Sequence, residues 1–166
     1  MSDLIYEHHP LNEAAACGDT VTVTTLLDLG TPVNNRDQYD ETPLHRASWE
    51  GHLDVVILLL LRGAAVNSRA GTGKTPLHRA ARQNNHEIVT VLIEHWADIN
   101  AVTRENETPL HWGAFGGAYE ACVLLLAAGA SPSTENYHQE NPAQVASRQG
   151  HHRVAALIEA HLKERS

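Results

Sequence analysis

The sequence is poor in residues that build a large globular core or join a chain covalently. Its 166 residues include one phenylalanine and two cysteines, whereas leucine, alanine and valine are abundant. Such small aliphatic side chains suit thin layers of closely packed helices. We expect Cys17 and Cys122 in the same helical layer of distant parts of the fold, so no disulfide is predicted. A reducing compartment, the cytosol or the nucleus, is the matching expectation.

Long apolar segments and an excess of positive charge are also missing. The apolar run over residues 55–61 has seven residues, too few to span a bilayer. Residues 1–9 lack the basic and apolar regions of a secretory signal peptide. The chain has 12 Lys and Arg against 20 Asp and Glu, a formal charge of −8. This balance argues against binding nucleic acid or docking on an anionic membrane.

A tetrapeptide that recurs every 33 residues organises the chain. The sequence Thr-Pro-Leu-His occupies residues 42–45, 75–78 and 108–111. One further step in each direction reaches degenerate copies at residues 9–12 and 141–144. A period of this length is typical of a stacked solenoid, in which each repeat buries its apolar face against its neighbours.

The phrase Thr-Pro-Leu-His-x-Ala at a 33-residue period resembles the ankyrin repeat family. The resemblance implies an all-α fold of helix-turn-helix units joined by short β-hairpins, in a right-handed, slightly curved stack. One domain, residues 1–166, is expected. Its five predicted repeats cover residues 4–36, 37–69, 70–102, 103–135 and 136–166.

The second repeat shows how the period becomes structure. Thr42 is a good helix N-cap, and Pro43 suits the first helical position because its missing N–H is not needed there. Gly51 and His52 break this first helix, and residues 53–62 then carry the apolar stripe of a second helix. Gly63 closes the second helix in the left-handed conformation.

Three segments depart from this pattern. Residues 21–25 alternate like a strand, but the register places them in a second helix. Trp96 stands where Gly30, Gly63 and Gly129 stand in other repeats, and a bulky residue at positive φ costs about 1 kcal/mol. The last helix is polar through Arg165, which with the threonines of the first repeat predicts two finished, capped ends.

A segment resembling a nucleotide-binding P-loop lies at residues 69–75. Ser68 occupies the position of its first glycine, and the motif needs a buried strand ahead of it. Thr75 is moreover followed by proline and is expected to cap a helix. The segment therefore predicts a decoy, with nucleotide binding at Lys74 kept as a minor alternative.

The sequence predicts no catalytic, metal or cofactor site. Three of its twelve histidines belong to the tetrapeptide, and the pairs at residues 8–9 and 151–152 lie at opposite ends of the stack. Residues 86–90 start like a zinc-protease helix but have Thr90 in place of the second histidine. Cys122 falls in an apolar stripe and is expected to be a small core residue.

Function should lie in residues that the repeat does not dictate. In ankyrin stacks the hairpin tips and the exposed side of the first helices form a concave groove that holds partner proteins. Tryptophan, tyrosine and arginine dominate binding hot spots. Projected onto this chain, the predicted partner-binding residues are Tyr39, Arg46, Trp49, Glu50, Arg69, Arg79, Arg82, Arg104, Glu105, Trp112, Phe115, Tyr137 and Arg148.

These residues suit a partner protein with an apolar anchor and acidic flanks. The alternative is structural: the basic side chains pair with Glu41, Glu50, Glu105 and Glu107, while the tryptophans pack between repeats. The resemblance implies non-catalytic protein binding as an adaptor, scaffold or inhibitor. A targeting or substrate-recruitment module of a larger enzyme complex stays open.

The resemblance also raises asparagine hydroxylation. Asn67 and Asn100 occupy the loop position that an iron- and oxoglutarate-dependent enzyme modifies in many ankyrin proteins. The alternative is an asparagine that hydrogen-bonds its own turn. A glycosylation pattern at Asn106 matters only in a secreted protein.

Overall fold

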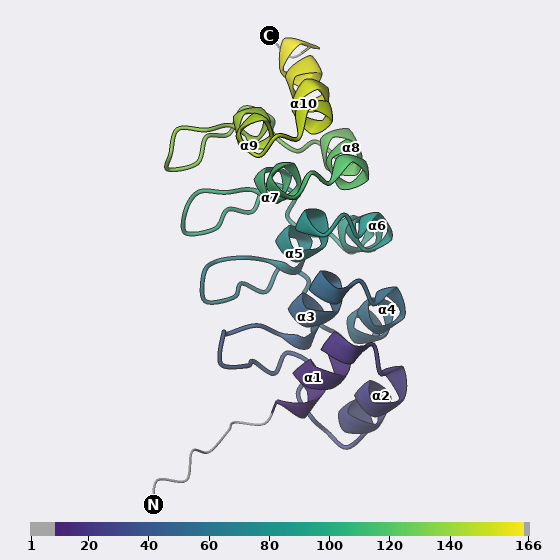
Figure 1. Ribbon diagram of the computed structural model, residues 1–166. Helices are drawn as coiled ribbons and strands as arrows, with labels where there is room; N and C mark the ends of the chain where they lie inside the picture. Colours follow the sequence, from purple (N-terminus) through teal and green to yellow (C-terminus); the bar gives the residue numbers. More distant parts are fainter. Residues whose placement is uncertain (1–8, 165–166) are drawn as a thin grey trace, which may run out of the picture.

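The computed structural model describes residues 9–164, and this part of the chain forms ten α-helices arranged as five antiparallel pairs (Figure 1). His8, Arg165 and the predicted start of the first repeat at residue 4 lie outside the described residues. The helices are α1 Pro10–Cys17, α2 Thr20–Asp28, α3 Pro43–Glu50, α4 Leu53–Leu61, α5 Pro76–Arg82, α6 His86–Glu94, α7 Pro109–Gly116, α8 Tyr119–Ala127, α9 Pro142–Arg148 and α10 His152–Glu164.

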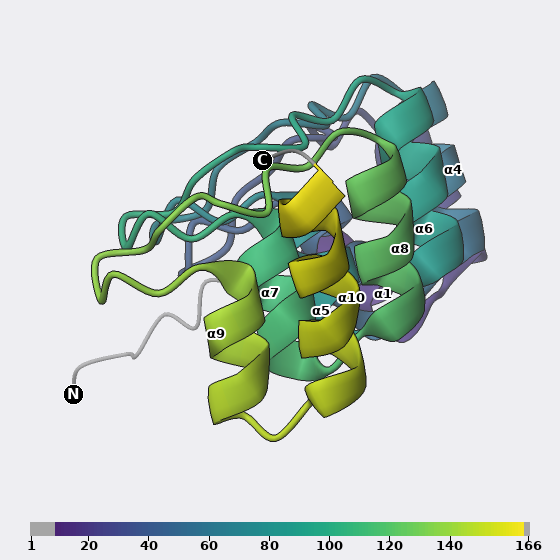
Figure 2. The same cartoon turned by 90° about the horizontal axis from the view of Figure 1, so that it is seen from above.

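The helices stack in two columns. The odd-numbered first helices pack on one another in one column, and the even-numbered second helices form the other (Figures 1 and 2). Long loops project from the side of the first helices (Figure 1). This arrangement confirms the predicted all-helical solenoid, and α2 confirms that the register outweighs the strand-like alternation of residues 21–25.

The core lies between the columns and repeats with the sequence period. The tetrapeptide leucines Leu44, Leu77 and Leu110 are completely buried. Val56 and Val89 meet them from the second helices, and Cys122 fills the next equivalent position, also completely buried. Cys122 is thus the small core residue that the sequence predicts.

The position of Cys17 corrects one prediction. Cys17 ends α1 in the first-helix column, whereas Cys122 lies within α8 in the second, so the two do not share a layer. The error came from assigning the layer without counting the offset of each cysteine from its tetrapeptide. Both cysteines are free thiols.

The projecting loops replace the predicted β-hairpins, because residues 9–164 contain no strand. Each loop is closed by one backbone hydrogen bond, as from Asp37 N–H to the Glu41 carbonyl at 3.0 Å. Consecutive tips are joined by another, as from Gly71 N–H to the Tyr39 carbonyl at 3.3 Å. Two isolated bonds do not make a ladder, so the segment has the course of a hairpin without strand pairing.

The histidine of each tetrapeptide joins one repeat to the next. His45 Nδ1 accepts the Thr42 N–H at 3.2 Å, and this assigns the ring proton to Nε2, which donates to the Lys74 carbonyl at 3.0 Å. His78 and His111 make the same pair of bonds 33 residues on. In the first repeat Asn12 donates to the Glu41 carbonyl at 2.8 Å instead.

Burial keeps these imidazoles neutral. It lowers the pKa of His45 to about 4 and that of His78 to about 3, although the hydrogen bond to the neighbouring carbonyl works in the opposite direction. Because the folded-state pKa lies below the ordinary 6.5, the unfolded chain binds protons first. Each histidine therefore contributes stability above pH 6.5 that is lost as the pH falls towards its folded-state pKa.

Replacing His78 by asparagine should make the fold less sensitive to acid. Between pH of about 7.5 and about 5, we expect His78→Asn to lose about 2 kcal/mol less free energy of unfolding than the unmodified protein does. Urea unfolding at the two pH values measures the difference. Leu92→Ala is the control, because it empties a completely buried site without removing a titrating group. Equal pH dependence in His78→Asn and the unmodified protein would contradict the linkage.

Candidate functional site

The middle of the first-helix column carries an ion pair that crosses repeats. Glu41 closes the loop before α3 and is 3% exposed, and its carboxylate accepts from the Arg79 guanidinium on α5. Arg46 approaches the same carboxylate at 3.7 Å. Burial, and then the charge of Arg82, lower the pKa of Arg79, while Asp37 works in the opposite direction. The pair fixes the Arg79 side chain across the neighbouring helix.

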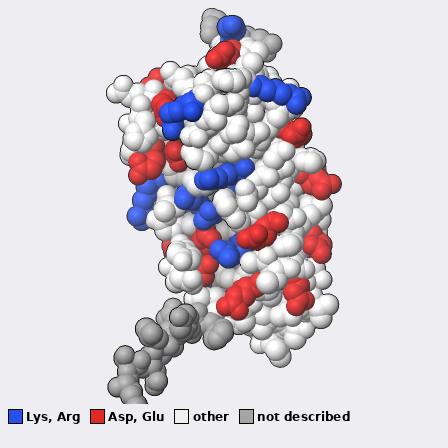
Figure 3. Space-filling model, viewed as in Figure 1, with Lys and Arg blue, Asp and Glu red and all other residues white. Residues whose placement is uncertain are grey.

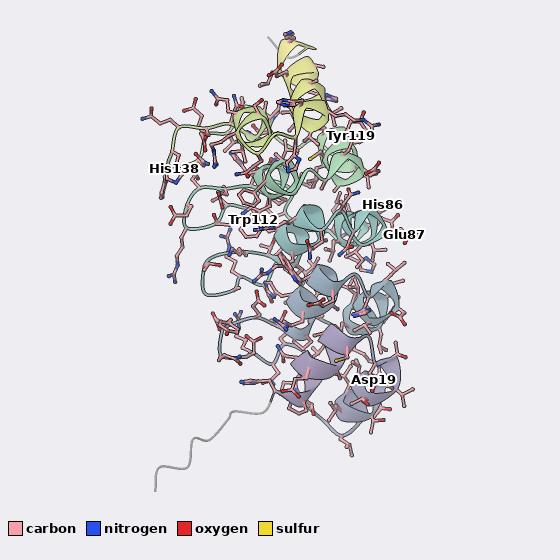
Figure 4. The ribbon with its side chains drawn as sticks, viewed as in Figure 1. Asp19, His86, Glu87, Trp112, Tyr119 and His138 are labelled. Atoms are coloured by element: carbon pink, nitrogen blue, oxygen red, sulfur yellow. The ribbon has the colours of Figure 1, made fainter. Side chains whose placement is uncertain are left out.

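Trp112 is held beneath the surface from several sides. It is 8% exposed, and its indole N–H donates to the Glu107 carboxylate at 2.8 Å. Its ring meets the buried His78 ring edge-on, with 6.3 Å between centroids. Lys74 Nζ lies 4.4 Å from the centroid of the Trp112 ring. The indole, labelled in Figure 4, therefore supports a lysine more than it offers its own face to a partner.

Arg82 lies among three aromatic rings. Its guanidinium carbon is 4.5 Å from the Phe115 centroid, 5.3 Å from that of Trp112 and 5.7 Å from that of Trp49. The Arg79 guanidinium lies 4.9 Å from the Trp49 ring. The arginine–aromatic cluster, as we call it, consists of Trp49, Lys74, Arg79, Arg82, Trp112 and Phe115.

Two cations of this cluster lack an acidic partner. Among residues 9–164, no carboxylate lies within 4.0 Å of Lys74 Nζ or the Arg82 guanidinium, and neither side chain donates a hydrogen bond. Partial burial lowers the pKa of Lys74, with Glu107 working in the opposite direction. Figure 3 shows Lys and Arg gathered over the middle of this face. The cluster thus presents positive charge against an aromatic surface in an acidic protein.

The other predicted partner-binding residues divide into two groups. Arg69 donates to the Val102 carbonyl at 2.6 Å, and Arg148 forms a two-point pair with Glu140 at 2.7 and 3.1 Å. These two serve the structural role that the alternative predicts. The residues that stay exposed at the loop tips or the end of α3 are Tyr39, Glu50, Arg104, Glu105 and Tyr137.

Sequence reasoning left Lys74 out of the partner-binding set. Its position on a loop tip is visible from the period, but the resemblance of residues 69–75 to a P-loop drew attention elsewhere. A second contact, Arg153 over the Tyr119 ring at 3.9 Å, joins α10 to α8 and has no signal in the repeat (Figure 4).

The P-loop-like segment is engaged in the repeat structure. Gly73 N–H donates to the Ala70 carbonyl at 2.7 Å, and Thr75 N–H donates to His78 Nδ1 at 3.1 Å. These amides are therefore not turned towards a common phosphate position. In the described part of the chain, no three His, Cys, Asp or Glu residues are grouped to hold a metal ion. No helix there is both long and apolar enough to cross a membrane.

The loop asparagines bridge repeats instead of closing their own turns. Asn67 Oδ1 accepts the Asp98 N–H at 2.8 Å, and its Nδ2 donates to the Trp96 carbonyl at 3.1 Å. Asn100 accepts the Ser131 N–H at 2.9 Å in the same way. Both residues are exposed, and their hydroxylation stays a prediction.

Comparison with known families agrees with the period and the fold. The family model described as ankyrin repeats in three copies matches residues 3–70 and 60–136. The chain belongs to the ankyrin repeat family. Ankyrin repeats are generally protein–protein interaction modules, and the family is typically non-catalytic. A search of curated proteins found no match.

Removing the charge of Glu41 should destabilise the protein strongly. Glu41→Gln leaves the half-buried Arg79 without its counter-ion, and we expect a loss of about 3 kcal/mol in the free energy of unfolding. Glu140→Gln is the matched control, because its partner Arg148 is exposed and such pairs contribute less than about 1 kcal/mol. Urea unfolding at neutral pH measures both variants. Similar losses in the two would show that the Glu41 pair is no more than a surface contact.

Proposed function

We propose that this ankyrin-repeat protein is a non-catalytic adaptor, scaffold or inhibitor that holds a partner protein along its loop tips and first helices. The observation that carries the proposal is the unpaired charge of Lys74 and Arg82 above the rings of Trp112 and Phe115. Cations held over aromatic faces are partly desolvated. An incoming carboxylate therefore gains more from pairing with them than it would with mobile surface lysines.

The chemistry of the cluster suggests what the partner presents. A carboxylate of the partner pairs with Lys74 and Arg82, and an apolar side chain lies against Phe115, which remains about one-third exposed at 36%. Trp112 and Arg79 act mainly by fixing the positions of these groups. This division follows from the burial of Trp112 and the pairing of Arg79 with Glu41.

The exposed loop tips extend the proposed surface on both sides of the cluster. Tyr39 and Tyr137 can add aromatic contacts, since tyrosine loses little conformational entropy on binding. A standard interface buries about 800 Å² on each partner, which requires several consecutive loops. We propose the cytosol or the nucleus as the location, and two free cysteines support a reducing compartment.

Reversing the unpaired charges should abolish capture of the partner. We expect tagged protein to retain a specific protein from a cell lysate and Lys74→Glu/Arg82→Glu to retain at least about tenfold less, as hot-spot substitutions do. The variant removes no buried pair, so circular dichroism should show an unchanged helical fold. Quantitative mass spectrometry of the retained proteins makes the comparison.

The control variant is Arg62→Glu, which reverses a charge at the end of α4, away from the cluster. It should retain the partner as the unmodified protein does. If the double variant retains the partner equally well, the arginine–aromatic cluster is not the binding surface.

A further inference from the structure

Trp96 lies outside the arginine–aromatic cluster and is the most exposed large apolar side chain among the described residues, at 88%. Its φ is +63°, the left-handed conformation that Gly30, Gly63 and Gly129 adopt at the equivalent positions. Backbone bonds hold it there: Trp96 N–H donates to the Ile93 carbonyl at 3.0 Å. A left-handed non-glycine residue costs about 1 kcal/mol or more. Neither the fold nor the proposed groove accounts for an indole at this strained position.

Two further apolar side chains continue the surface around Trp96. Leu29 follows the last turn of α2 and is 78% exposed, while Leu61 ends α4 and is 76% exposed. The ends of these helices are adjacent, because Arg62 pairs with Asp28 at 2.8 Å. Asn67 in turn joins the end of the next loop to the Trp96 carbonyl. Leu29, Leu61 and Trp96 therefore form one line across three repeats, which we call the Trp96 row.

The charge beside Trp96 is negative. Glu94 ends α6 and Asp98 follows Trp96 by two residues, and both are exposed. Within residues 9–164, no Lys, Arg or His nitrogen lies within 4.0 Å of either carboxylate. Arg62, the arginine at this end of the helices, is engaged by Asp28. The row thus combines an open indole with two unpaired carboxylates, the opposite charge to the cluster.

We propose that the Trp96 row is a second docking surface, which binds a basic segment of another protein. A Lys or Arg of that segment lies on the exposed indole and pairs with Glu94 or Asp98, and an apolar neighbour covers Leu61. Cation–π and ionic contacts reinforce each other in this arrangement because the same cation makes both. An acidic segment on the cluster and a basic segment on the row can be bound at once. The protein then bridges two partners, as an adaptor or scaffold does.

A phage-displayed library of random dodecapeptides tests the row without knowledge of the partner. Panned on the full chain, the library should yield peptides with Lys or Arg beside an apolar residue. Trp96→Gly should weaken their binding at least about tenfold, and Glu94→Lys/Asp98→Lys should do the same. Trp96→Gly places at this position the residue that three other repeats use, so it keeps the backbone conformation and the fold.

The matched control separates this proposal from the groove. Basic peptides that bind the row should bind Lys74→Glu/Arg82→Glu as tightly as the unmodified protein, whereas ligands of the cluster should lose that variant and keep Trp96→Gly. The proposal is overturned if no selected peptide depends on Trp96, or if those that do are acidic. Concentration-dependent sedimentation abolished by Trp96→Gly would also overturn it, because a second copy of the chain would then occupy the row.

Discussion

The structure depends on a buried, neutral imidazole that hydrogen-bonds in two directions. In each complete tetrapeptide the histidine accepts from the threonine that starts its own helix and donates to the carbonyl before the next helix. One side chain therefore fixes both the start of a helix and the distance to the following repeat. Asn12 reproduces only the second of these bonds. Leucine packing supplies the hydrophobic stabilisation, but the imidazole sets the register in which the layers meet.

This register also assembles the candidate surface. Glu41 and Arg79 are 38 residues apart in sequence, and Arg82 meets rings from α3 and α7 as well as its own surroundings on α5. No single repeat contains the arrangement, because each contributes only one or two of the side chains. The surface is a property of the stack, and its geometry is as rigid as the contacts between neighbouring first helices.

The period predicts the helices, their caps and the core because these follow from positions repeated every 33 residues. Trp96 shows how far this reaches: its departure from glycine predicts the left-handed strain that the structure has. Side-chain contacts between repeats are less accessible, since they depend on rotamers that differ at each layer. Trp112 is consequently more buried than its place on a first helix suggests, and Lys74 gains its importance only from the ring beneath it.

The thin connections between loop tips give the molecule a stiff spine and a compliant edge. Single backbone hydrogen bonds join each tip to the next, from Gly71 to Tyr39, from Arg104 to Thr72 and from Tyr137 to Glu105. The helical columns, by contrast, are packed along their whole length. Bending therefore concentrates at the loop edge, where few contacts resist it. The tips can spread or close around cargo of different thickness, like the fingers of a hand, while the palm keeps its shape.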